Sequence, residues 1–267
     1  MIEAIFFDID GTLIAAGTAL PGAVAAVDEA RRRGLALRFL TNITRRGPDE
    51  IAAELREQGF AVDGAEIQTA TTACVEHLRA RPGVRCHLLV PASVRHLFDG
   101  IATDDRQPDV VVISDIGEAF NFDVLNRAFL MLRAGAELVA PQKGLFWIDR
   151  DGPKLDCGSF IVGLEAATGK QALVTGKPSE LFFRRALAHV GCRMDEVLVI
   201  GDDVGTDVRG AARVGAHSAL VGTGKYAPGA ERNGADRPDH FLLTLERLPA
   251  LLDELRASPR QHETATK

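Results

Sequence analysis

Short apolar segments alternate with helix patterns along most of this chain of 267 residues. Apolar runs long enough for buried strands occupy 2–7, 35–41, 84–90, 109–114, 136–141, 172–177, 196–203 and 218–222. Helix patterns fill 23–33, 48–58, 70–80, 122–134, 159–168, 179–189 and 206–214. Because strands that alternate with helices favour parallel pairing, this order predicts an α/β fold built on a Rossmann-like, doubly wound parallel sheet.

Polar side chains follow four of these predicted strands. Asp8 and Asp10 end the first, and Thr41-Asn42 ends the second. The segment ALVTGKP leads to Lys177, and EVLVIGDD ends in Asp202 and Asp203. In doubly wound sheets, ligands bind beyond the carboxyl ends of the strands. If all four strands share one sheet, these groups meet at one edge of it.

The pair Asp8 and Asp10 carries an electrostatic cost. Alternate residues of a strand point to the same side, so the two carboxylates crowd each other. At an effective dielectric constant of ~20, two charges ~5 Å apart repel by roughly 3 kcal/mol. Mg²⁺, which takes oxygen ligands, would offset this repulsion. The alternative is a simple turn, because Asp10-Gly11 is also a common hairpin signal.

The combined set of side chains suits phosphoryl transfer. Asp8 could attack phosphorus and form an aspartyl-phosphate. Asp10 could protonate the leaving group and then activate water. Asp202, together with Asp8, would hold Mg²⁺, while Lys177 and Thr41 would take phosphoryl oxygens.

Each of these residues also has a plain structural interpretation. Lys177 stands where a helix could start, Thr41-Asn42 could cap a loop, and residues 201–207 could form a solvated acidic loop. These separate explanations do not account for the placement of every group at the end of a predicted strand.

Four motifs of the chain resemble, in order, those of the haloacid dehalogenase (HAD) superfamily of phosphatases. They are DIDGTL at 8–13, TN at 41–42, GKP at 176–178 and GDDVGTD at 201–207. The long insert between Asn42 and Lys177 resembles the C2-type cap of NagD-like members. The resemblance implies a Mg²⁺-dependent hydrolase with an aspartyl-phosphate intermediate, acting on small phosphorylated compounds.

The resemblance also implies a role for each motif residue. Asp8 and Asp10 would be catalytic, and Asp8, Asp10 (through its carbonyl oxygen) and Asp202 would bind the metal. The phosphate would be held by Thr41, Asn42 and Lys177. Asp203 and Asp207 would orient the metal ligands without binding the metal themselves. The chain departs from the usual pattern at Arg46, where the family often has Ser or Thr.

Three further segments narrow the expected substrate: DVVVISDIGEAFNFDVLNRAF, TGKPS with LFF, and VGTGKY. They look like those of phosphatases for pyrophosphate and P–N phosphoramidates. A NagD-type phosphatase for sugar phosphates or nucleoside monophosphates is the alternative. A phosphotransferase is a nearer rival, but Asp10 favours water as the acceptor. A non-catalytic phospho-acceptor is disfavoured because its acidic pair normally precedes the phosphorylated aspartate, and a binding protein is disfavoured because no motif residue is missing.

The resemblance divides the chain into a catalytic core of 1–82 and 172–255, a C2-type cap of 83–171, and a frayed tail of 256–267. Relatives with such caps are often homodimers through the cap. Within the predicted cap, Asp156-Cys157-Gly158-Ser159 begins a helix. Capping by Asp156 or Ser159 is favoured there over contact with the substrate.

Bulk properties exclude several classes of partner. The net charge of −6 argues against binding to nucleic acid or an anionic membrane. No apolar run approaches the ~20 residues that span a bilayer. Because the first strand starts at Ile2 without a basic region before it, we expect no signal peptide. The four cysteines lack zinc-site spacing, which predicts reduced thiols and a cytoplasmic location.

Overall fold

The computed structural model describes residues 1–149, 152–232 and 236–257. The segment LFWIDRDGPKLD (145–156) predicts a hairpin that turns at Asp151-Gly152. Asp151 lies outside the described part, as do residues 258–267 of the expected tail. Contacts divide the chain into two compact units, and each is described separately. The first comprises Met1–Leu40, Ala53–Glu66 and Ala186–Lys267. The second comprises Thr41–Ala52 and Ile67–Arg185.

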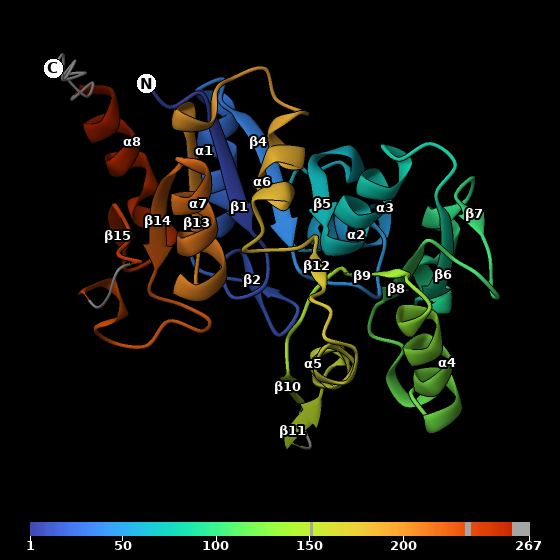
Figure 1. The fold of residues 1–267 in the computed structure, drawn as a ribbon. Coiled ribbons are helices and arrows are strands. Elements are labelled where there is room, and N and C mark those ends of the chain that lie inside the picture. The colour runs from blue at the N-terminus through green and yellow to red at the C-terminus, as the bar shows by residue number, and fades with distance from the viewer. Residues whose placement is uncertain (150–151, 233–235, 258–267) are drawn as a thin grey trace, which may run out of the picture. The chain divides into compact units, whose positions relative to one another are not determined.

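A parallel sheet forms the centre of the first unit, with the strand order β15-β14-β13-β1-β4 (Figure 1). The strands are β1 (Ala4–Asp8), β4 (Ala36–Thr41), β13 (Val197–Gly201), β14 (His217–Val221) and β15 (His240–Leu242). All five residues of β1 are buried. It pairs with β4 on one side and β13 on the other, which makes it a central strand.

The first helix of this unit begins and ends where the sequence indicates. α1 (Ala23–Arg32) follows Pro21-Gly22, ends before Gly34 and buries an alanine- and valine-rich face. The others are α7 (Arg209–Val214) and α8 (Leu248–Ala257), with a small hairpin of β2 (Ile14–Ala15) and β3 (Thr18–Ala19). α2 (Pro48–Glu57) and α6 (Glu180–Leu187) cross the boundary between the units.

The second unit has a parallel sheet of its own, ordered β12-β9-β8-β6-β7. Its strands are β6 (Arg85–Leu89), β7 (Ala102–Thr103), β8 (Val110–Ile113), β9 (Glu137–Ala140) and β12 (Leu173–Val174). The remaining elements are β5 (Ile67–Thr69), α3 (Ala70–Arg79), α4 (Phe122–Arg133), α5 (Cys157–Thr168) and the hairpin of β10 (Phe146–Asp149) and β11 (Gly152–Leu155).

Apolar side chains cover both faces of this second sheet. Val111 and Ile113 of β8 pack with residues of α4 and α5. Val110 and Val112 of the same strand pack with residues of α3. The strand is therefore apolar at every position because both of its faces are buried.

The structure corrects three expectations. Segment 172–177 does not add a strand to the sheet that contains β1, because β12 pairs with β9 of the second sheet. Only two residues of the segment form a strand, so its local pattern could not identify its partner. α5 begins at Cys157, earlier than predicted, and α8 continues through Ala257, into the expected tail. The cap boundaries at 83 and 171 stay a prediction.

Two glycines of α5 offer a matched test of packing. A Cβ atom at Gly158 would lie 2.3 Å from the Gly144 carbonyl oxygen, whereas one at Gly163 would meet nothing within 4 Å. We expect Gly158→Ala to lower the free energy of unfolding by about 1–3 kcal/mol. Gly163→Ala should raise it by about 0.5–1 kcal/mol, because alanine is the better helix former. Urea unfolding of both variants measures the difference, and equal effects would contradict this packing.

Candidate active site

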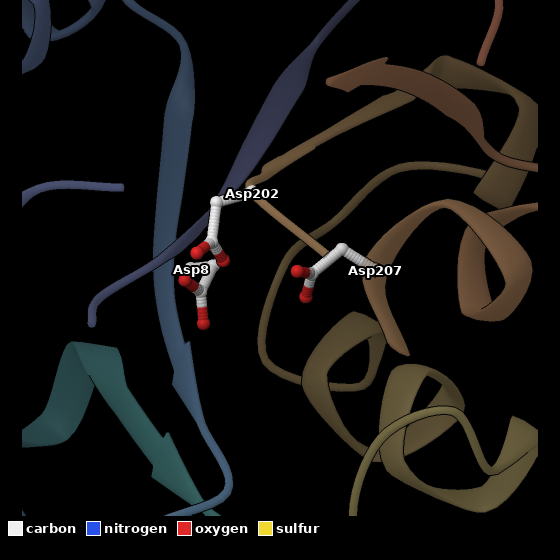
Figure 2. Close-up of side chains that lie close together, drawn as sticks. All are labelled: Asp8, Asp202 and Asp207. Atoms are coloured by element: carbon white, nitrogen blue, oxygen red, sulfur yellow. The ribbon is translucent and has the colours of Figure 1, made fainter. Parts of the chain in front are cut away.

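Two neighbouring strands of the first unit place Asp8 and Asp202 side by side. Asp8 is the last residue of β1, and Asp202 directly follows β13. The strands are parallel, with Phe7 opposite Ile200, so both carboxylates emerge at the same sheet edge (Figure 2). Asp8 is 6% exposed and Asp202 is 3% exposed. The sequence analysis predicted this pair from the strand ends.

Asp207 joins these two carboxylates from the π-helical turn of residues Val204–Val208. It is buried, and one carboxylate oxygen of each residue lies within 4.8 Å of the others. Figure 2 shows the three carboxyl groups close together. A Cβ atom at Gly201 would lie 2.2 Å from the Asp207 carboxyl carbon, so only glycine at position 201 permits this approach.

This group of three carboxylates suits a divalent cation. Three buried negative charges at such spacing repel one another strongly, and a hard cation both neutralises them and prefers oxygen ligands. Residues Asp8, Asp202 and Asp207 would hold it. The structure thus places Asp207 among the candidate ligands, whereas the sequence analysis gave it a supporting role.

Asp10 and Asp203 lie at the margin of this group. Asp10 is exposed and pairs through its backbone with Ile14. Asp203 accepts a hydrogen bond from the Gly205 N–H (2.7 Å) and forms an ion pair with Lys225 (3.1 Å). The supporting role of Asp203 and the metal contact of the Asp10 carbonyl both stay predictions.

The turn after β1 orients the Asp8 side chain. The Thr12 hydroxyl donates to Asp8 Oδ2 at 2.9 Å, and both residues are buried. The N–H groups of Leu13 and Ile14 donate to the Ile9 carbonyl oxygen and close the turn. The Asp-Gly signal that suggested a turn is thus accurate, and this turn also carries the carboxylates.

Sequence analysis missed the loop after β14 as part of the site. The Lys225 N–H donates to Asp202 Oδ2 at 2.6 Å, and the Thr223 hydroxyl donates to the Gly11 carbonyl oxygen at 2.6 Å. Partial desolvation lowers the pKa of the Lys225 ammonium, but Asp203, Asp202 and Asp8 outweigh this effect, so its pKa is raised. The sequence signal that could have identified this loop is TGK at 223–225, directly after a buried strand.

The predicted phosphate-binding residues belong to the second unit. The Asn42 side-chain amide donates to the Lys177 carbonyl oxygen (3.0 Å) and accepts from the Lys177 N–H (2.8 Å). Thr41 Oγ1 accepts from the Ile43 N–H at 3.0 Å. Lys177 and Thr41 are both buried. Asn42 thus fixes the backbone that carries Lys177, and phosphate binding by these three residues stays a prediction.

The start of α5 is a capped helix end, as the sequence analysis favoured. The Asp156 carboxylate accepts from the Cys157 N–H at 2.6 Å. The Gly158 N–H donates to the Gly144 carbonyl oxygen, and the Ser159 hydroxyl donates to the Leu145 carbonyl oxygen. Burial, together with Asp156, raises the pKa of the Cys157 thiol, so it is a poor nucleophile.

A parallel α/β unit with carboxylates beyond the ends of its central strands is the architecture of hydrolases that act on phosphoryl groups. Family models described as haloacid dehalogenase-like hydrolase and HAD-hydrolase-like match residues 5–102 and 174–248. The chain belongs to the HAD-like hydrolases and, within them, to the NagD-like phosphatases.

Relatives support this membership over almost the whole chain. Phospholysine phosphohistidine inorganic pyrophosphate phosphatase of Rattus norvegicus is 37% identical over 94% of both chains. Haloacid dehalogenase-like hydrolase domain-containing protein 2 of Homo sapiens is 37% identical over 95% of this chain and 96% of its own.

Solved structures agree with the same family. A 4-nitrophenylphosphatase from Thermotoga maritima matches with a TM-score of 0.86 and 27% identity, over 93% of this chain and 97% of its own. NagD from E. coli matches with a TM-score of 0.84 and 25% identity, over 92% and 97%. Among the residues that the structure describes, no helix is long and apolar enough to cross a membrane.

Proposed function

We propose that the protein is a Mg²⁺-dependent phosphatase that transfers the phosphoryl group of its substrate to Asp8. One observation carries this proposal: Asp8, Asp202 and Asp207 are buried, and each offers an oxygen within 4.8 Å of the others. Bound Mg²⁺ would neutralise these carboxylates and the phosphoryl oxygens, which lets an anionic nucleophile approach an anionic substrate.

The side chains of the first unit support a two-step reaction. A carboxylate held by the Thr12 hydroxyl keeps one orientation, which favours attack on phosphorus. The bond from phosphorus to the leaving group breaks as the bond to Asp8 forms, and Asp10 gives its proton to the leaving group. Asp10 then takes a proton from water, which attacks phosphorus and frees Asp8 and phosphate.

Small phosphorylated compounds are the proposed substrates, with pyrophosphate or P–N phosphoramidates first. The name of the rat relative supports this choice, because it contains pyrophosphate, phospholysine and phosphohistidine. The second candidate substrate is a sugar phosphate or a nucleoside monophosphate, which corresponds to the NagD-type alternative of the sequence analysis.

The proposed location is the cytoplasm, because four free thiols, three of them buried, suit its reducing conditions. Homodimerisation through the cap is part of the same proposal.

Metal removal tests the reaction. In excess chelator we expect 4-nitrophenyl phosphate hydrolysis to fall at least about 100-fold and to return with Mg²⁺, because several kcal/mol of charge stabilisation are lost. Mg²⁺ should also raise the thermal unfolding temperature without substrate. That rise should shrink in Asp202→Asn and persist in the control Asp99→Asn, whose side chain is exposed. Full activity in excess chelator would refute the metal requirement.

A panel of substrates tests the proposed substrate class. We would compare kcat/KM for pyrophosphate, imidodiphosphate, phosphohistidine, phospholysine, sugar phosphates and nucleoside monophosphates. A sugar phosphate or nucleotide that exceeds the pyrophosphate and P–N compounds tenfold would select the second candidate.

A further inference from the structure

The loop Gly222–Lys225 holds a residue that the proposed reaction does not yet use. Its TGK sequence follows β14, and two hydrogen bonds tie it to the site: the Thr223 hydroxyl donates to the Gly11 carbonyl oxygen, and the Lys225 N–H donates to the Asp202 carboxylate. A Cβ atom at Gly224 would lie 1.9 Å from Asp202 Oδ2 and 2.6 Å from the Gly11 Cα atom. The loop is therefore packed directly against Asp202, which fixes the base of the Lys225 side chain beside the acidic group.

The ammonium group of Lys225 lies outside the buried carboxylates. Its side chain is 72% exposed, whereas Asp8 and Asp202 are almost fully buried. It contacts Asp203 Oδ2 at 3.1 Å. An exposed ion pair of this kind contributes little to stability, so Lys225 can exchange Asp203 for another anion at small cost.

We propose that Lys225 binds the leaving group of the substrate and selects leaving groups that are themselves anionic, such as the second phosphate of pyrophosphate. This inference rests on the proposed function. Asp8 and Asp202 are buried, so a leaving group departs from them toward solvent. Lys225, whose N–H contacts Asp202, carries its exposed ammonium beside this acidic group. Several carboxylates at the site would repel an anionic leaving group, and Lys225 supplies charge-assisted hydrogen bonds that offset this repulsion.

The reaction stays balanced under this assignment. The Asp8–phosphorus bond forms, the bond from phosphorus to the bridging oxygen breaks, and that oxygen receives the proton of Asp10. Lys225 donates hydrogen bonds to the departing phosphate and keeps its own protons. Phenyl phosphate, whose leaving group has no permanent charge, gains less from Lys225.

The test compares leaving groups in Lys225→Met. This variant keeps the backbone N–H that binds Asp202 and loses the ammonium group together with its ion pair to Asp203. We expect kcat/KM for pyrophosphate and for 2-phosphoglycolate to fall at least tenfold more than kcat/KM for phenyl phosphate. Lys225→Arg should restore most of the difference. Lys170→Met, which removes an equal charge from a lysine that contacts the Gly135 carbonyl oxygen in the second unit, should change none of the three.

The outcomes separate this inference from the proposed function. Equal losses on all three substrates, or no loss on any, would overturn the leaving-group assignment while the phosphatase stands. A wild-type enzyme that prefers phenyl phosphate to both anionic compounds would overturn it as well. A wild-type enzyme that hydrolyses none of them with Mg²⁺ would refute the proposed function itself.

Discussion

Asp8→Asn is expected to lower turnover at least about 10⁴-fold, because an amide cannot replace a carboxylate as the attacking group. The substitution preserves the shape of the side chain and leaves an oxygen that can accept from Thr12, so the fold should persist. With Mg²⁺ and labelled substrate, acid quenching should trap phosphorylated wild-type protein and no phosphorylated variant. Near wild-type turnover in Asp8→Asn would refute the covalent assignment.

The same variant should be more stable than the wild type when metal is absent. The amide would replace one of three buried charges, and each such repulsion amounts to roughly 3 kcal/mol at ~5 Å and an effective dielectric constant of ~20. Thermal unfolding in chelator measures this gain. Asp28→Asn, which removes an exposed charge from α1, should leave the unfolding temperature almost unchanged. A loss of stability in Asp8→Asn would show that the three carboxylates do not repel as their spacing predicts.

Asp10→Asn should lower turnover about 10³-fold, because it removes the general acid of the first step and the general base of the second. Its effect should depend on the leaving group in a way that no structural defect would reproduce. 4-Nitrophenolate departs without help from a proton, so the first step should survive with 4-nitrophenyl phosphate and slow strongly with an alkyl phosphate.

Rapid mixing separates the two steps in this variant. With 4-nitrophenyl phosphate we expect a burst of nitrophenol that matches the enzyme concentration, followed by slow release of phosphate. Burst size and steady-state rate together identify which step has slowed. An equal loss on aryl and alkyl phosphates, without a burst, would remove Asp10 from its acid–base role.

Local sequence patterns predicted the α/β fold and the pair Asp8 and Asp202, because both depend on strands whose apolar pattern is complete. Asp207 lies in a π-helical turn, and no periodic pattern of apolar residues in the sequence predicts such a turn. Lys225 lies 23 residues beyond Asp202 in a loop, so only the folded chain brings its N–H to that carboxylate.

The Asn42 contact and the pairing of β12 escaped the sequence analysis for a related reason. The Asn42 amide binds the Lys177 backbone 135 residues away, and nothing near Asn42 in the sequence indicates this partner. The two-residue strand β12 pairs with β9, more than thirty residues earlier, through backbone hydrogen bonds that no side-chain pattern specifies. Long-range backbone contacts therefore account for most of what the motifs did not reveal.

The pairing of β1 sets the order in which a growing chain can complete this protein on the ribosome. β4 becomes available soon after β1, but Val197, the partner of Ala4 in β13, emerges about 190 residues later. At ~5–20 residues per second, β1 waits roughly 10–40 s with one edge unpaired. The strands of the second sheet all fall within residues 85–174, so this sheet can form during the wait. The nascent chain thus carries an apolar strand in need of protection until β13 has emerged.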